Sequence, residues 1–137
     1  MQSAGYLTNH MARLFAQGLE ARIKPLGIVP GQFPALLALW EQDGRTQKEL
    51  VDLLDVEQAT MANTLTRMER DGLIVRKPHP GDGRAQLIWL TAKAKKLERP
   101  AIAAAQAQNK LALGTLSPQE QRQFIALMQR VIDAMRA

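Results

Sequence analysis

The stretch Arg70-Asp71-Gly72-Leu73-Ile74 closes a helical run, and Asp82-Gly83-Arg84-Ala85-Gln86-Leu87-Ile88-Trp89-Leu90-Thr91 follows shortly after it. This order predicts a helix that ends at the glycine, a strand over residues 73–77, a turn-rich tip over 78–83 and a returning strand over 85–90. The tip contains two prolines and two glycines, which keep it from continuing either strand. We therefore expect a helix followed by a stiff, protruding β-hairpin.

Two short helices are predicted upstream of this hairpin. They begin near Thr46-Gln47-Lys48-Glu49-Leu50 and Glu57-Gln58-Ala59-Thr60-Met61, and a turn near Asp55 separates them. Thr46 can cap the first helix, and Glu49 stands three residues further on, which is the pattern of a capping box. The spacing of the two helices is typical of a helix-turn-helix.

The second of these helices, predicted over residues 57–71, has two different faces. Met61, Leu65 and Met68 follow the i, i+4, i+7 rule and are expected to pack inward. The opposite face is uncharged and hydrogen-bonding in its first half, where a recognition helix meets bases, and cationic later. A solvated polar face without a partner is the alternative. The DNA-binding candidates on this helix are Gln58, Thr60, Asn63, Thr66, Arg67 and Arg70.

Several motifs follow one another in a fixed order. They are Leu26-Gly27-Ile28 with Gln32-Phe33, then Gln47-Lys48-Glu49-Leu50, then residues 65–74, and finally Asp82 and Arg84 before Leu90-Thr91. Their order and spacing resemble the MarR family of bacterial winged-helix transcription regulators, over nearly the whole chain. The resemblance implies a mainly α fold with a small β-hairpin wing, in which dimerisation helices at the N- and C-termini flank a winged helix-turn-helix core.

The resemblance also implies a role for the hairpin as a wing. Arg84 would reach a minor groove or its phosphates, and Asp82 would be a nearby carboxylate that can orient the guanidinium. A surface pair of Asp82 and Arg84 with little energetic consequence is the alternative.

A small ligand is a further implication of the resemblance. In this family the ligand is often an anionic phenolic or aromatic compound, placed in a crevice between the dimerisation and DNA-binding parts. Arg13 or His10 could balance its charge, although both could equally be surface or interface residues. The candidate ligand-binding residues are Tyr6, His10, Arg13, Leu14, Phe33, Leu37 and Trp40.

Amphipathic helices are predicted at both ends of the chain. One spans residues 7–24 and stops at Pro25. A second spans 91–113 and contains Pro100, which predicts a kink or break near Arg99. The last helix, over 115–137, carries an apolar stripe that has no partner in the DNA-binding part. The candidate dimerisation residues are Leu7, Met11, Phe124, Leu127, Val131 and Met135.

The length of 137 residues suits one domain or two small interpenetrating ones. We assign residues 31–91 to a winged helix-turn-helix DNA-binding domain, and residues 1–30 with 92–137 to a helical dimerisation region. A monomer in which the terminal helices form a simple cap is the alternative.

The net charge of +5 fits a polyanionic partner but does not establish one. Between residues 46 and 91 the chain has six lysines and arginines against seven acidic residues. The predicted DNA-binding part is therefore not basic overall, so the hypothesis depends on where its cations point.

The sequence disfavours several other classes of protein. It shows no long apolar run and no basic-then-apolar leader, so we expect neither a membrane span nor a signal peptide, and a cytoplasmic protein. The absence of cysteine excludes thiol-oxidation sensing. His10 and His79 lie on different elements, and no phosphate loop or HExxH motif is present, so we expect no enzyme, cofactor or metal site.

The function expected from these features is a homodimeric, sequence-specific transcription regulator that acts on palindromic double-stranded DNA operators. The resemblance favours a repressor released by a small anionic aromatic effector. The alternatives are a ligand-insensitive architectural DNA-binding protein and a winged-helix module for protein interaction. Salt dependence and a specificity ratio distinguish the first two, and the absence of DNA affinity would favour the third.

Overall fold

The computed structural model describes residues 2–137, which form a mainly helical fold with one small antiparallel sheet, as predicted. The elements in chain order are α1 (Ala4–Ile23), η1 (Lys24–Leu26), η2 (Pro30–Gln32), α2 (Phe33–Glu41), β1 (Arg45–Thr46), α3 (Gln47–Leu54), α4 (Gln58–Arg70), β2 (Ile74–His79), β3 (Asp82–Leu90), α5 (Ala92–Ala112) and α6 (Pro118–Arg136).

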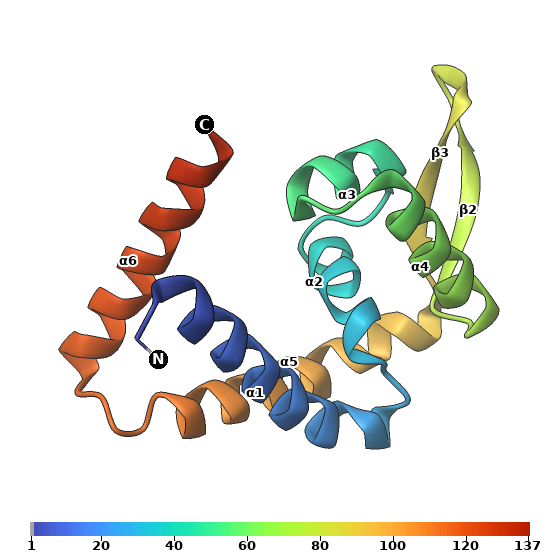
Figure 1. Ribbon diagram of the computed structural model, residues 1–137. Coiled ribbons are helices and arrows are strands. Elements are labelled where there is room, and N and C mark those ends of the chain that lie inside the picture. Colours follow the sequence, from blue (N-terminus) through green and yellow to red (C-terminus); the bar gives the residue numbers. More distant parts are fainter. Residues whose placement is uncertain (1) are drawn as a thin grey trace.

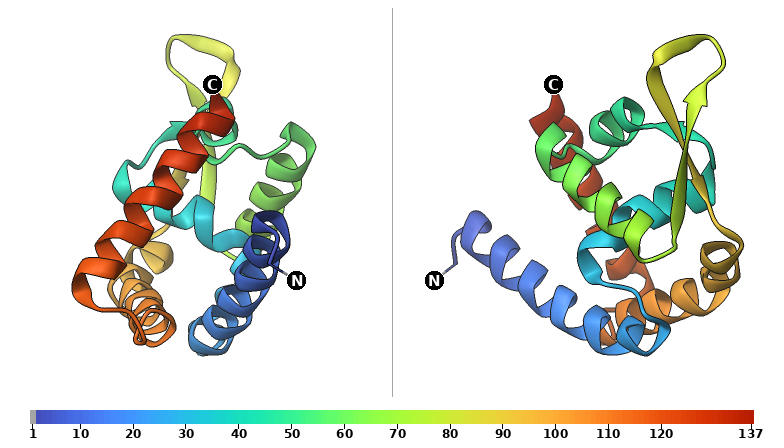
Figure 2. Two further views of the ribbon diagram at one scale, coloured as in Figure 1. Left: turned by 60° about the vertical axis from the view of Figure 1, so that its left-hand side comes forward. Right: turned by 90° about the vertical axis from the view of Figure 1, so that its right-hand side faces the viewer.

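The helices and the hairpin are arranged around one winged-helix unit. α2, α3 and α4 pack together beside the β2–β3 hairpin, and the end of the hairpin projects beyond the helices (Figure 1). α1 and α5 lie against each other below this unit, and α6 runs back from the far end of α5. Two further views show the same projection of the hairpin (Figure 2).

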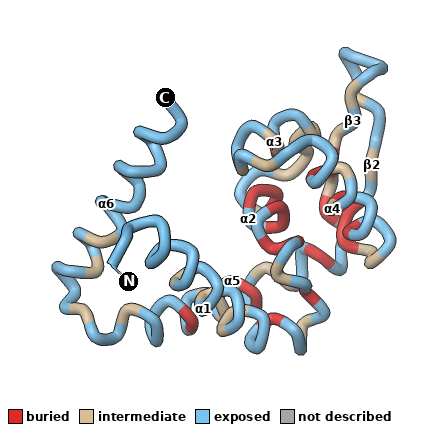
Figure 3. Tube along the Cα trace, viewed as in Figure 1, coloured by how far each residue is buried: buried red, intermediate tan, exposed pale blue. Residues whose placement is uncertain are grey.

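Most buried side chains lie in the winged-helix unit and where α1 and α5 meet it (Figure 3). The predicted stripe of Met61, Leu65 and Met68 is buried, as expected from its helical spacing. Leu36, Leu39 and other apolar side chains of α2 belong to the same core cluster as this stripe. α4 is therefore held by its apolar face, and its polar face is left outside.

Local signals in the sequence explain where the helices begin and turn. The capping box predicted at Thr46 is confirmed, since Thr46 pairs with Glu49 at the start of α3, and Ser117 pairs with Glu120 in a second capping box at the start of α6. Asp55 has a positive φ of 53° and makes the turn between α3 and α4. Asp and Asn adopt this conformation more readily than other non-glycine residues.

The sheet differs from the predicted hairpin in two ways. A third strand, β1, pairs with β3 and gives the order β1-β3-β2; two residues are too few to produce an alternating pattern. The predicted tip over 78–83 is also wrong, because the strands continue to His79 and resume at Asp82. Pro78 is tolerated in β2, because β2 is an edge strand and a bulge follows Pro78.

Two predicted helix boundaries also need correction. The sequence predicts that the helix with Pro34 in its first turn ends at Gly44, but α2 ends at Glu41. Gly44 has a φ of 73° and lies so close to the Trp89 ring that a Cβ would clash with it. α5 continues through Pro100, so the predicted break near Arg99 is wrong. Ala94 and Ala101, before and after the proline in the sequence, are buried, and the packing of α5 against α1, α2 and β3 keeps the helix continuous despite the missing N–H.

The last helix, α6, is packed differently from the other α-helices. None of its residues is buried, although its apolar side chains follow helical spacing. Val131 and Met135 are 58% and 81% exposed. Over residues 2–137, none of the helices has the length and hydropathy that a membrane-spanning helix requires.

Candidate nucleic-acid interface

The polar face of α4 is presented to the outside of the molecule. All six DNA-binding candidates on this helix are exposed, namely Gln58, Thr60, Asn63, Thr66, Arg67 and Arg70. Because the apolar stripe is buried on the other side, this face keeps a fixed orientation relative to the core. By helical spacing Asn63, Thr66 and Arg70 lie opposite the buried stripe, and Gln58, Thr60 and Arg67 flank it.

The first half of this face has free hydrogen-bonding groups. Among the described residues, the side chains of Gln58, Thr60 and Asn63 make no hydrogen bond to another part of the chain. An amide group offers both donors and an acceptor, and can therefore pair with the edge of a base. These three side chains are free to bond to a ligand without first breaking an internal contact.

Thr66 is different, because its hydroxyl group is already engaged. Its Oγ1 donates to the carbonyl of Ala62 at 2.9 Å and accepts a hydrogen bond from Nη2 of Arg76 at 3.1 Å. Arg76 lies on β2 and is partly buried. The sequence did not single out Arg76, since nothing in a strand pattern shows which helix residue a side chain meets.

The end of the recognition helix carries an ionic network. Arg70 pairs with Asp71 at 3.1 Å, and Gln32 donates to the same carboxylate at 3.0 Å. The hydrogen bonds from Arg70 and then Gln32 hold the pKa of Asp71 below its usual value. Lys93 donates to the backbone carbonyl of Asp71. Arg70 is therefore partly neutralised, whereas Arg67 is an exposed cation without an ion pair among the described residues.

The wing carries Arg84 near its end, with its side chain exposed. The expected contact between Asp82 and the Arg84 guanidinium is not what the structure shows. Asp82 Oδ1 instead accepts a hydrogen bond from the backbone N–H of Arg84 at 3.0 Å. This bond shapes the turn at the start of β3, because aspartate commonly bonds to the backbone two residues on. Asp82 thus positions the backbone of Arg84 and leaves the guanidinium free.

A groove of about 600 Å³ separates the helix-turn-helix from the wing. It brings Gln58, Asp82 and Arg84 together with residues that the sequence did not single out as candidates. These additional residues are Thr46, Gln47, Lys48, His79, Gly83, Ala85 and Gln86. Gln47 and Lys48 stand at the start of α3, so the capping box could have indicated that their side chains emerge at this end of the helix.

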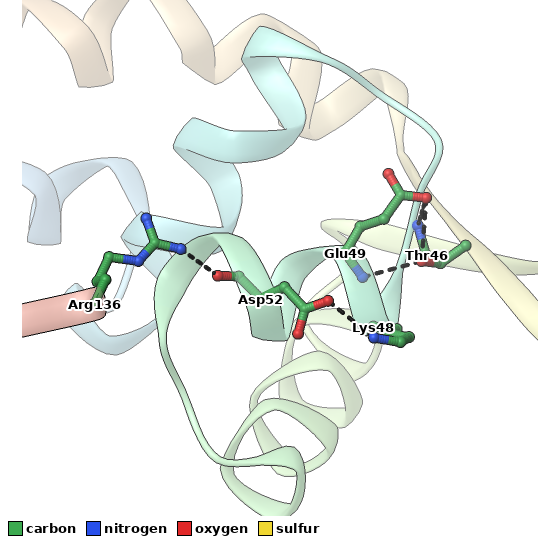
Figure 4. A network of polar contacts seen from close by, with 5 residues as sticks. All are labelled: Thr46, Lys48, Glu49, Asp52 and Arg136. Carbon is green, nitrogen blue, oxygen red and sulfur yellow. Dashed lines mark hydrogen bonds and ion pairs between the residues drawn. The ribbon is translucent and has the colours of Figure 1, made fainter. Parts of the chain in front are cut away.

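The start of α3 is well ordered by its own contacts. Figure 4 shows Glu49 bonded to Thr46, and Lys48 paired with Asp52 at 3.0 Å. The same view shows Arg136 of α6 donating to the backbone carbonyl of Asp52 at 2.9 Å. Arg136 also pairs with Asp55 at 3.0 Å. The last turn of α6 therefore reaches the turn of the helix-turn-helix.

The predicted ligand-binding residues do not line one common site. Phe33 and Leu37 line a pocket of about 270 Å³ between α1, α2 and α5, which also contains Gln108 and Asn109. Leu14 lines a separate groove of about 660 Å³ between α1, α5 and α6. Trp40 donates from Nε1 to the carbonyl of Ala94 and has an edge-to-face contact with Phe33. Tyr6, His10 and Arg13 are exposed on α1 and line neither space.

The predicted dimerisation residues fall on two helices that face each other across the larger groove. Met11, Phe124 and Leu127 line this groove of about 660 Å³. Leu7, Val131 and Met135 are exposed further along α1 and α6. Within residues 2–137, no group of three or more histidine, cysteine, aspartate or glutamate side chains is placed to hold a metal ion.

Comparisons with known proteins point to one family. The model of the MarR family matches residues 28–85. The transcriptional regulator HosA of Escherichia coli O111:H- is 33% identical to this chain over 103 residues, which make up 75% of this chain and 76% of HosA.

Solved structures show the same fold. A MarR family transcriptional regulator from Listeria monocytogenes, complexed with a 26mer DNA, has a TM-score of 0.90 at 24% identity and covers 98% of this chain and 90% of that chain. The PcaV transcriptional regulator of Streptomyces coelicolor, in complex with its natural ligand, has a TM-score of 0.87 at 25% identity and covers 98% of this chain and 94% of that chain. The chain described here belongs to the MarR family of winged-helix transcription regulators, which are DNA-binding proteins and not enzymes.

Proposed function

We propose that this protein is a homodimeric repressor that binds palindromic operators and is released by a small aromatic ligand. The observation that carries the proposal is the exposed face of α4, where Gln58, Thr60 and Asn63 have free hydrogen-bonding groups beside the wing cation Arg84. This combination suits a major groove read by α4 and a neighbouring groove or backbone contacted by the wing.

The side chains divide into groups that read sequence and groups that hold the backbone. Asn63 and Gln58 can each pair bidentately with an adenine edge, and Thr60 can bond to several bases. Arg67 and Arg84 supply charge for phosphates or a narrow minor groove. Gln47 and Lys48 line the same groove as Arg84 and are further candidates for phosphate contacts.

A dimer would give this interface its operator symmetry. We propose that residues 1–30 and 92–137 form the dimerisation region and residues 31–91 the DNA-binding domain. Two copies related by a two-fold axis would place two α4 helices on half-sites about one helical turn apart, and the operator would be palindromic. The open apolar stripe on α6 supports this proposal, because a second copy would cover it.

Selection of bound sequences from random duplexes tests the DNA-binding part of the proposal. We expect an enriched palindrome and a specific affinity at least about a thousand-fold above that for random DNA at the same salt. Affinity without sequence preference would favour the architectural alternative, and no affinity would favour a protein-interaction module. Transcription from a promoter that carries the palindrome then distinguishes repression from activation.

The pocket between α1, α2 and α5 is the best candidate for the ligand. Its 270 Å³ suits a single aromatic ring, and it is lined mainly by Phe15, Phe33, Leu37 and other apolar side chains. Its polar groups are the amides of Gln108 and Asn109, and Arg22 donates to Gln108 at 3.2 Å. Since His10 and Arg13 line neither pocket, we propose that Arg22, acting through Gln108, balances the charge of an anionic ligand.

Titration of phenolic acids such as salicylate against the dimer tests this ligand role. Operator release is read by fluorescence anisotropy, and binding by calorimetry. A ligand that prefers the DNA-free form by about 100-fold supplies about 2.7 kcal/mol for release. Leu37→Trp should fill the pocket and abolish ligand binding while operator binding persists. Binding of an aromatic acid that leaves DNA affinity unchanged would contradict the proposed induction.

A further inference from the structure

The hydroxyl group of Thr66 connects the recognition helix to the wing. Its single proton is donated to the carbonyl of Ala62 at 2.9 Å, and one of its lone pairs accepts Nη2 of Arg76 at 3.1 Å. While these bonds persist, Thr66 has no proton left to donate to a base or a phosphate. The bond to Arg76 therefore gives Thr66 a different role from that of its neighbours on α4.

Arg76 stands where the hairpin leaves the core. It lies opposite Ile88, whose side chain is buried, in the register of β2 and β3. Beyond this pair, no residue of the segment 77–87 is buried. Within the part of the chain that the structure describes, Arg76 is the outermost residue of β2 whose side chain is hydrogen-bonded to α4.

The arginine at this position is costly for the fold. Its Nε is buried and has no hydrogen-bond partner among the described residues. A buried donor without an acceptor destabilises a protein, and an apolar side chain of similar length would avoid that cost. Folding alone therefore does not explain why the guanidinium of Arg76 lies between β2 and Thr66.

We propose that Arg76 is a positioning residue, which through Thr66 holds the wing at a fixed angle to the recognition helix and aligns Arg84 with the bases that α4 reads. The proposal rests on the DNA-binding function proposed above. Arg84 lies four residues from Ile88, the partner of Arg76, a distance of about 13 Å along the strand. A rotation of about 10° at Arg76 would move Arg84 by about 2 Å over that length, which is enough to break a hydrogen bond to DNA.

A double-mutant cycle on the selected operator tests the connection. Thr66→Val removes the hydroxyl group at nearly constant shape, and Arg76→Met removes the guanidinium. Each variant is expected to weaken operator binding about 10-fold, since each breaks a hydrogen bond to a charged group. Because both break the same connection, the double variant is expected to bind no worse than either single variant. Thr66→Ser keeps the hydroxyl group and is expected to restore binding.

The same helix offers a matched control for the threonine. Thr64 also donates its hydroxyl proton to the backbone, at 2.9 Å from the carbonyl of Thr60, but no side chain donates to it in the described structure. Thr64→Val therefore removes an equivalent hydroxyl group without touching the wing. Thermal unfolding of all variants, followed by circular dichroism, separates a loss of wing position from a loss of folded protein.

A spin label on the wing tests the proposal without DNA. The chain has no cysteine, and a Cβ at Gly83 would meet no other atom within 4 Å, so Gly83→Cys accepts a single label. We expect Thr66→Val and Arg76→Met to narrow the spectrum of this label, because the wing becomes more mobile, and Thr66→Ser and Thr64→Val to leave it unchanged. This result would support the connection between Thr66 and Arg76 whether or not the protein binds an operator. A wild-type protein that bound no operator would overturn only the proposed function.

Three results would overturn the role of Arg76. Additive losses of affinity in the double variant would show that Thr66 and Arg76 act separately. A salt slope that falls for Arg76→Met but not for Thr66→Val would show that Arg76 binds a phosphate directly. Unchanged spectra in both variants would show that the wing is held by its base alone.

Discussion

The winged-helix unit buries its apolar side chains, whereas the C-terminal helix α6 leaves its apolar side chains exposed. On α4, Met61, Leu65 and Met68 are buried within the same chain, where α4 packs against α3, β2 and η2. On α6, Leu127 and Val131 follow an equally regular helical spacing and remain more than half exposed. The same apolar spacing therefore lies in a buried core on α4 and on an exposed surface on α6.

The difference indicates which region depends on a second copy of the chain. Most helices in proteins gain their stability from packing on an apolar face and not from their intrinsic helix propensity. α6 has no such packing within residues 2–137, apart from the contacts of its ends. We expect the winged-helix unit to stay folded when the protein is diluted, whereas α6 should keep its structure only in the dimer.

The largest expected effect comes from charge placed on the open stripe. Leu127→Asp combined with Val131→Asp would bury two carboxylates in the proposed interface, which is strongly unfavourable. We expect the dimer to dissociate and operator binding to be lost, as measured by sedimentation velocity and anisotropy. Gln119→Asp with Ala126→Asp, on the opposite face of α6, is the matched control. A wild-type protein that sediments as a stable monomer at micromolar concentration would show that α6 does not need a second copy of the chain.

The second effect concerns the buried core of the winged-helix unit. Leu65→Ala should destabilise the protein by about 2–5 kcal/mol, because it removes a fully buried side chain and leaves a cavity. Leu53→Ala, at a side chain of α3 that is 43% exposed, is the control and should change stability much less. Chemical denaturation at several protein concentrations measures both. A loss at Leu65 that varies with concentration would show that this core also depends on the dimer.

Sequence patterns predicted the regions whose determinants are local. The stripe of Met61, Leu65 and Met68, the capping box at Thr46 and the turn at Asp55 all depend on neighbours within a few residues. These predictions are confirmed by the structure. The mainly α fold with a small wing is confirmed as well.

The failed predictions depend on contacts between distant parts of the chain. β1 exists because Arg45 and Thr46 pair with Ile88 and Leu87, which a two-residue strand cannot reveal by itself. The strands reach His79 and Asp82 because each supports the other, whereas proline and glycine alone indicated a longer tip. Arg76 was missed for the same reason, since its partner Thr66 lies on another element.

The third effect concerns sequence-specific DNA binding, and the variant should remain a dimer. Asn63→Ala removes an exposed amide that can pair with a base, and should cost about 1–3 kcal/mol for each half-site and relax the preference at one base pair. Quantitative selection with the variant measures both changes. An unchanged selected sequence together with unchanged affinity would show that Asn63 does not contact a base.

The wing should affect DNA binding in another way. Arg84→Ala is expected to weaken binding to all sequences, and to reduce the salt slope by about 0.9 for each wing if the contact is to a phosphate. If the guanidinium enters a minor groove, the preference for A·T pairs beside the half-site should fall instead. Anisotropy titrations over a range of salt concentrations distinguish these results. Identical affinity and slope in the variant would show that the wing does not contact DNA.

The smallest effect concerns the contact that joins the two regions. Arg136 pairs with Asp55 at 3.0 Å and donates to the carbonyl of Asp52, but both of its contacts lie at the surface. Exposed ion pairs contribute about 0.2–1 kcal/mol, so Arg136→Gln should lower the free energy of unfolding by no more than that. Arg130→Gln removes an exposed arginine of α6 that has no ion pair among the described residues, and serves as the control. A loss above about 2 kcal/mol in Arg136→Gln, beyond the range of exposed pairs, would show that α6 is held by its own chain and not by a partner.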